Sequence, residues 1–234
     1  MNGRKGGSAL PAGGPPTELV LRAAGRSGEL VLRRRGRHLE VVCNGVFLIS
    51  SENEESSRAL VTAARPWLPA RPLEVLVGGL GLGFALDEAL RLPALAAVTV
   101  AEYEPQVQAW FSRFGGRRAR RAAADGRARI VIADVLDVLR DDAASFDLIC
   151  LDTDNGPEWL MREANAGLYE AEGVALVHAA LKPAGVAAFW SPERYARFEA
   201  LLGAHFASVH AVAAADTVGG RRHVYTMYTA VKGA

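Results

Sequence analysis

The sequence predicts an α/β fold in which a mostly parallel β-sheet carries helices on both faces, preceded by a small antiparallel sheet. From residue 70 onward, short apolar runs alternate with segments of helical periodicity, the pattern of parallel strands joined by crossover helices. The first run, residues 73–77, leads into glycines at positions 78, 79, 81 and 83. A strand, a glycine turn and a helix in this order are typical of a nucleotide or nucleoside site.

The composition narrows the class of protein. A chain of 234 residues that is 50% hydrophobic is long enough for one α/β domain with a small appendage. The formal net charge of +1 gives no general attraction to nucleic acids or membranes, so we expect neither as a partner. Cys43 and Cys150 each lie in an apolar run and are expected to be reduced core residues. With no metal-ligand cluster, no secretory leader and no apolar run of roughly 18 residues, we predict a cytoplasmic protein without a bound metal.

The N-terminal part divides into three segments before the main domain. Residues 1–16 are rich in Gly, Pro and Ala without periodicity and are expected to be disordered. Residues 17–52 contain short strand-like runs, with the hairpin signal Asn44-Gly45 before the last, and should form a small antiparallel sheet. Residues 53–69 combine apolar residues at helical spacing with closing prolines, which predicts a helix that connects this sheet to the main domain, residues 70–234.

Acidic residues follow three of the predicted parallel strands. After the strand at 73–77, we expect strands at 97–101, 129–133, 146–151, 186–190, 205–212 and 223–231, with helices from Pro105 and over 170–181. The strands at 97–101, 129–133 and 146–151 lead to Glu102, Asp134 and Asp152. Because the carboxyl ends of parallel strands meet at one edge of a sheet, these carboxylates and the glycine turn should share one crevice. Glu102 follows the glycines by about 20 residues, the spacing at which a carboxylate can bind both ribose hydroxyls, so an adenosine-bearing cofactor is expected.

Four segments resemble the successive motifs of class I S-adenosylmethionine-dependent transferases. They are Val-Gly-Gly-Leu-Gly-Leu-Gly at 77–83, Ala-Glu-Tyr-Glu-Pro at 101–105, Ile-Ala-Asp-Val at 132–135 and Leu-Lys-Pro-Ala-Gly-Val at 181–186. The N-terminal strands, Asn44-Gly45 and the segment 50–60 are similar to the spermidine synthase branch. The resemblance implies the Rossmann-like class I methyltransferase fold, a seven-stranded sheet with a reversed final strand. It also implies that the β appendage helps subunits associate, so a homodimer is expected.

The resemblance implies roles for individual residues of a cofactor-binding catalytic domain. Glu102 would bind the ribose hydroxyls, Asp134 would bind the adenine amino group, and Asp152 stands where spermidine synthases hold the carboxylate proposed to accept the proton of the attacking amine. The expected cofactor-binding residues are Gly78, Gly79, Gly81, Gly83, Glu102, Tyr103, Asp134, Val135 and Asp152, and the expected acceptor-binding residues are Asp154, Asn155 and Trp190. Asp152, Asp154 and Asn155 could equally cap or turn the loop that follows the strand at 146–151, and Trp190 could be a core residue.

Three positions depart from the spermidine synthase pattern. That family has an aspartate in the glycine loop that holds the amine of decarboxylated S-adenosylmethionine, whereas Gly81 stands here, and Leu48 and Ser57 replace a glutamine and a tyrosine. A loop without a carboxylate no longer repels the carboxylate of intact S-adenosylmethionine. We therefore predict methyl transfer from S-adenosylmethionine to a small-molecule acceptor, with Asp152 as the base.

Three alternatives to methyl transfer stay open. The chain could be a polyamine aminopropyltransferase that uses decarboxylated S-adenosylmethionine, or a non-catalytic homologue that only binds the cofactor. An NAD-dependent oxidoreductase would use the same glycines, but the chain has no second catalytic domain and no convincing acid/base set. The arginine run at 117–121 could meet phosphates or an acidic partner, but in a nearly neutral protein we expect it to be a solvated helix end.

Overall fold

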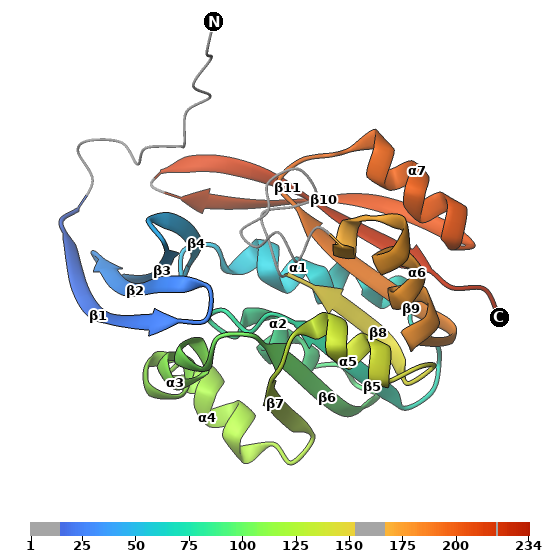
Figure 1. Cartoon of the computed structure of the whole chain (residues 1–234), viewed down its shortest axis with the longest axis horizontal. Helices are drawn as coiled ribbons and strands as arrows, with labels where there is room; N and C mark the ends of the chain where they lie inside the picture. Colours follow the sequence, from blue (N-terminus) through green and yellow to red (C-terminus); the bar gives the residue numbers. More distant parts are fainter. Residues whose placement is uncertain (1–14, 153–166, 219) are drawn as a thin grey trace, which may run out of the picture.

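The computed structural model describes residues 15–152, 167–218 and 220–234. Most of the predicted N-terminal tail, residues 1–14, lies outside this part of the chain, as do Asp154 and Asn155. Figure 1 shows a small sheet near the N-terminus beside a larger sheet that is covered by helices.

The small N-terminal sheet contains four strands that pair in chain order, each antiparallel to the next. They are β1 (Thr17–Gly25), β2 (Gly28–Arg35), β3 (His38–Cys43) and β4 (Val46–Ser50). Between β3 and β4, Asn44 and Gly45 have φ values of 48° and 79°, the left-handed conformation that a tight two-residue hairpin requires. The predicted antiparallel sheet and its Asn-Gly hairpin are confirmed.

A helix follows this sheet and leads to the main domain. Helix α1 (Glu54–Ala64) is continued by the short 3-10 helix η1 (Arg65–Trp67), which contains Pro66. Leu60, Val61 and Ala64 are fully buried and belong to the same hydrophobic core as the strands of the larger sheet. The helix is present where the sequence predicts it, and its apolar residues at helical spacing face the core.

The larger sheet has seven strands in the order β10-β11-β9-β8-β5-β6-β7. Their bounds are β5 (Leu73–Gly78), β6 (Leu95–Glu102), β7 (Ala128–Ile132), β8 (Phe146–Leu151), β9 (Leu181–Ser191), β10 (Ser208–Val218) and β11 (Arg221–Val231). All pairings among β5 to β9 are parallel, whereas β11 is antiparallel to both β9 and β10. The predicted seven-stranded sheet with a reversed final strand is confirmed.

The largest departures from the predicted bounds are those of two strands, β9 and β10. Strand β9 begins at Leu181 rather than at residue 186, because Leu181 already pairs with Phe146 before the register shifts. Strand β10 begins at Ser208 rather than at residue 205 and continues to Val218 rather than ending at residue 212, since it pairs with β11 along its whole length. The pairing partner of each strand, which local sequence does not reveal, sets these ends.

Helices cover both faces of the larger sheet (Figure 1), and the buried side chains form two hydrophobic cores. With α1, one core includes residues of α2 (Phe84–Ala89), α3 (Pro105–Phe114) and α4 (Arg117–Ala124). The other core includes residues of α5 (Val135–Asp141), α6 (Ala171–Ala180) and α7 (Ala196–His205). Because both faces are covered, all six residues of β8 are buried, and five of them are apolar. The sixth, Asp147, is paired with Arg71 and Lys182.

Cys43 and Cys150 are both buried and form no disulfide. Within the described ranges, no helix combines the length and the apolar character that crossing a membrane requires. The same part of the chain has no group of three or more His, Cys, Asp or Glu side chains arranged to hold a metal ion.

Candidate active site

The carboxyl ends of four parallel strands bring the predicted site residues together. Gly78 at the end of β5 pairs with Ala101 of β6 and with Leu151 of β8, and Glu102 pairs with Ile132 of β7. The main-chain N–H of Asp152 donates to the carbonyl of Gly78 at 3.0 Å. The glycine loop therefore lies between the strand ends that carry Glu102 and Asp152.

The glycine loop depends on backbone conformations that favour glycine. Gly79, Gly81 and Gly83 have φ values of 92°, 50° and 80°, where a side chain is strained. A Cβ at position 83 would lie 2.1 Å from Cε2 of Phe111, and one at position 81 would lie 3.0 Å from Cδ1 of Ile49. Gly83 is thus required for packing against α3, and Gly81 lets the loop pass close to β4.

Both carboxylate oxygens of Glu102, at the end of β6, accept hydrogen bonds from the main chain. Glu102 is only 7% exposed, and its oxygens accept the main-chain N–H groups of Leu80 and Glu104, each at 2.8 Å. Burial raises the pKa of Glu102, while the N–H donors act in the opposite direction. Since each carboxylate oxygen has two lone pairs, the anchored group keeps acceptor capacity for a pair of hydroxyls.

The neighbouring residues join this strand end to the N-terminal sheet. The carboxylate of Glu104 accepts the N–H groups of Arg26 and Ser27, at 2.8 Å and 2.7 Å, in the turn between β1 and β2. The Arg26 guanidinium lies over the ring of Tyr103, 5.3 Å from its centroid. Tyr103 is half-buried at this junction, so the small sheet closes one side of the predicted cofactor site.

Asp134 and Val135 begin the helix after β7. The Asp134 side chain caps α5 by accepting the N–H of Leu136 at 3.0 Å, and Val135 is buried. The cap holds the Asp134 carboxylate at the same sheet edge as Glu102. Its predicted contact with an adenine amino group remains a prediction.

Asp152 is half-buried at the end of β8 and contacts α1. The hydroxyl of Ser57 donates to its carboxylate at 3.2 Å. Burial raises the pKa of Asp152 to about 6, although the bond from Ser57 favours the charged form. A carboxylate with such a pKa is ionised at neutral pH yet basic enough to take a proton, which suits a general base.

The N-terminus of α1, which leads to Ser57, is held by the long β10–β11 hairpin. The carboxylate of Asp216 in β10 accepts the N–H groups of Glu55 and Ser56, each at 3.0 Å, and is 3% exposed. Asn53, just before the helix, donates its amide to the hydroxyl of Tyr225 in β11 at 3.3 Å. These contacts position Ser57 over the end of β8.

Trp190 lies at the end of β9, the strand next to β8. It is half-buried, and its ring centroid is 5.1 Å from that of Tyr225. Because Phe189 pairs with Leu151, the register places Trp190 beside Asp152. The two aromatic rings and the N-terminus of α1 therefore flank the candidate base on the side away from Glu102.

Solved structures resemble the chain over most of its length. A spermidine synthase in complex with the transition state analogue AdoDATO has a TM-score of 0.78 at 18% identity, the match covering 92% of this chain and 74% of that one. Spermidine synthase from Thermotoga maritima has a TM-score of 0.72 at 16% identity, covering 92% and 73%. The chain has the spermidine synthase fold. No model of a known protein family and no curated protein matches the sequence.

Several residues around the site were given no role in the prediction from sequence. Ser57 entered only as a departure from the spermidine synthase pattern, and Asn53, Asp216 and Tyr225 did not enter at all. A local signal marked Asn53, because Asn before a helix suggests a cap, but its side chain makes no capping bond and instead donates to Tyr225. No such signal existed for Asp216, which reaches α1 from 160 residues away.

Proposed function

We propose that this protein is a transferase that takes a group from an S-adenosylmethionine-type cofactor and passes it to a small-molecule nucleophile. The observation that carries the proposal is the arrangement of the strand ends, with the glycine loop and Glu102 on one side and Asp152 with Ser57 on the other. The spermidine synthase fold supports a transferase of this kind.

The residues present fit the adenosine part of such a cofactor. The loop from Gly78 to Gly83 can bring its main chain close to a ligand, because its glycines have no Cβ atoms. Glu102 is anchored with acceptor capacity for ribose hydroxyls, and Asp134 is held at the same edge for the adenine amino group. Tyr103 and Val135, which follow the two acidic residues, complete the proposed cofactor-binding set.

The proposed chemistry assigns proton transfer to Asp152. When bound, the cofactor supplies an electrophilic carbon attached to a sulfonium, a good leaving group. Asp152 accepts the proton that the attacking nucleophile loses, which requires the carboxylate within about 3 Å of that atom. Ser57 orients the carboxylate through its hydrogen bond, and Trp190, Asp154 and Asn155 are the proposed acceptor-binding residues. The main task of the protein is to align donor and acceptor.

Aminopropyl transfer to a polyamine is the first candidate reaction, with decarboxylated S-adenosylmethionine as donor. It is favoured by the solved structures, which are spermidine synthases, one of them bound to AdoDATO. Methyl transfer, the reaction predicted from the sequence, is the second candidate. It is favoured by Gly81, because the positive φ and the nearby Ile49 disfavour any side chain there, so this loop position offers no carboxylate to an amine.

Calorimetric titration of the protein with both donors tests the proposal. A preference of at least about tenfold, or 1.4 kcal/mol, for one donor selects between the two reactions. Glu102→Gln should weaken donor binding by at least about tenfold, whereas Glu172→Gln, an exposed change in α6, serves as the matched control. If neither donor binds, the cofactor assignment is refuted.

Turnover separates a transferase from a non-catalytic homologue. Putrescine with the decarboxylated donor tests the first candidate, and small hydroxyl, amine and carboxylate acceptors with the intact donor test the second. Tight donor binding without turnover of any acceptor would identify a cofactor-binding homologue. A cytoplasmic location and a homodimer remain predictions, the latter to be checked by sedimentation of the purified protein.

A further inference from the structure

A cavity lies outside the strand-end site, among helices α1, α2 and α4. It has a volume of about 410 Å³ and is lined by Arg58, Asp87, Arg91, Arg117, Arg118 and Arg121. None of these residues belongs to the proposed cofactor or acceptor site. Exposed Arg117 at the start of α4 agrees with the prediction of a solvated helix end, whereas half-buried Arg118, and Arg121 with its bonds to Leu90 and Asp87, depart from it.

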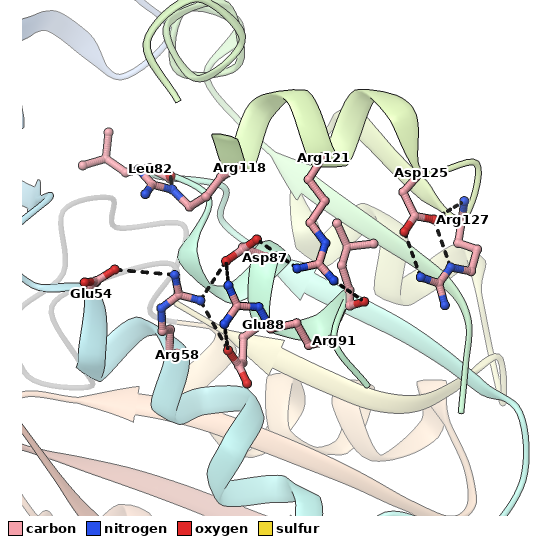
Figure 2. A network of polar contacts seen from close by, with 11 residues as sticks. Glu54, Arg58, Leu82, Asp87, Glu88, Arg91, Arg118, Arg121, Asp125 and Arg127 are labelled. Carbon is pink, nitrogen blue, oxygen red and sulfur yellow. Dashed lines mark hydrogen bonds and ion pairs between the residues drawn. The ribbon is translucent and has the colours of Figure 1, made fainter. Parts of the chain in front are cut away.

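Part of this positive charge is neutralised by carboxylates of the same helices (Figure 2). The buried Asp87 forms ion pairs with Arg58 at 2.9 Å, Arg91 at 2.8 Å and Arg121 at 3.6 Å. Glu88 adds contacts to Arg58 and Arg91, and Glu54 adds one to Arg58. Five arginines thus face three carboxylates, which leaves an excess of two positive charges.

The excess charge is concentrated at the start of α4. Arg117 is exposed, and its side chain has neither a hydrogen bond nor an ion pair with any residue in the described part of the chain. Arg118 donates to the carbonyl of Leu82 at 3.0 Å, and its guanidinium lies 4.1 Å from the centroid of the Phe84 ring, without a carboxylate partner there. Burial and the charge of Arg58 lower the pKa of Arg118, as expected where positive charge is under-compensated.

We propose that this cavity binds a small phosphate-bearing anion between α1, α2 and α4. Guanidinium groups bind phosphate oxygens in bidentate fashion and lose less hydration than ammonium groups. The volume lies within the range of small-molecule sites and exceeds the needs of a single phosphate. A pyrophosphate group, free or as part of a nucleotide, matches both the size and the two excess charges.

Two double variants with equal charge loss test the site. Arg117→Gln/Arg121→Gln removes two cavity arginines from α4, whereas Arg113→Gln/Arg120→Gln removes two exposed arginines of α3 and α4 that do not line the cavity. Arg118 is left unchanged because its contact with Leu82 reaches the glycine loop. Both variants lower the net charge equally, so a difference between them reports the cavity rather than general attraction.

Calorimetry at low salt then measures inorganic phosphate, pyrophosphate and ATP binding to the wild-type protein and both variants. We expect pyrophosphate to bind the wild type, with affinity reduced at least about tenfold in Arg117→Gln/Arg121→Gln and less than about twofold in the control. Tighter binding of ATP than of pyrophosphate, lost in Arg117→Gln/Arg121→Gln and kept in the control, would identify a nucleotide as the source of the phosphate groups. Pyrophosphate binding at least as tight as ATP binding would identify the free anion.

Three results would overturn the proposal. The first is that none of the three anions binds at about 10 mM. The second is an equal loss of affinity in both double variants. The third is that a single-stranded oligonucleotide binds through Arg117 and Arg121 while pyrophosphate does not bind. Thermal unfolding verifies that each variant is folded. If the first double variant does not fold, Arg117→Gln alone carries the test against Arg120→Gln, because Arg117 has no ion pair within the described residues that its loss could break.

Discussion

Replacing Asp216 with alanine tests whether the β10–β11 hairpin holds the helix that carries Ser57. The Asp216 carboxylate is 3% exposed and accepts two main-chain N–H groups of the first turn of α1, both at 3.0 Å. The local N-cap residue, Asn53, makes no side-chain capping bond of its own. Asp216 therefore supplies both the missing acceptor and a negative charge at the positive end of the helix dipole.

The expected loss of stability follows from these two bonds. Removing a local N-cap costs about 0.5–2 kcal/mol, and hydrogen bonds to a charged group contribute about 1.5–3 kcal/mol each before the cost of burying the charge is subtracted. We expect Asp216→Ala to lower the free energy of unfolding by about 2–3 kcal/mol, which is about 4–12 °C in Tm for a chain of this length. Asp216→Asn, which keeps one acceptor oxygen, should lose an intermediate amount.

Denaturant unfolding followed by circular dichroism measures the effect. Asp137→Ala is the matched control, because the Asp137 side chain is 67% exposed and forms an exposed ion pair with Arg140, also on α5, at 2.7 Å. It should change the free energy of unfolding by less than about 0.5 kcal/mol. Equal midpoints for Asp216→Ala and Asp137→Ala, at unchanged m-values, would refute the capping argument.

Three further predictions concern the strand-end site. The Ser57 hydroxyl favours the charged form of Asp152, so Ser57→Ala should move the acidic limb of the pH profile of kcat/KM to higher pH, whereas Ser56→Ala should not. If the acidic limbs of the Ser57→Ala and wild-type profiles coincide, the bond has no effect on the base. Because burial raises the pKa of Asp152 to about 6, its ionisation weakens the folded state as pH rises through that range. Asp152→Asn should therefore stabilise the protein at about pH 8 but not at about pH 4 in thermal unfolding, and a pH-independent effect would contradict this cause. Gly83→Ala should lower the free energy of unfolding by about 2–5 kcal/mol, because φ is positive and the Cβ would lie 2.1 Å from a ring of α3. Gly203→Ala, in open space within α7, should leave the free energy of unfolding unchanged or raise it. Similar unfolding midpoints for the two variants would rule out the packing role of Gly83.

Local sequence signals were sufficient for the main architecture. Alternating apolar runs predicted the parallel strands, and Asn44-Gly45 predicted the hairpin that the φ values confirm. The ends of β9 and β10 could not be predicted, because each ends where its pairing partner allows. Strand bounds are a property of a pair of segments, whereas periodicity belongs to one segment.

The arginine run shows a similar limit for side chains. In sequence, 117–121 is an isolated basic run in a nearly neutral protein, which favours a solvated helix end. In the structure, α2 brings Asp87 to Arg121, and α1 brings Arg58 to the same carboxylate. Charge balance in the cavity depends on three helices and could not be counted from one of them.

The sequence by itself determined which residues stand at the strand ends: the glycines after β5, then Glu102, Asp134 and Asp152. Parallel strands place their carboxyl ends at one edge whatever the details of packing, so the predicted succession of parallel strands along the chain was enough to bring these residues together. Only the tertiary structure decided what holds them. Ser57 reaches Asp152, and Asp216 caps the helix that carries Ser57, across separations of 95 and 160 residues. Such contacts depend on how helices and hairpins pack over the sheet, and no local pattern in the chain records that packing.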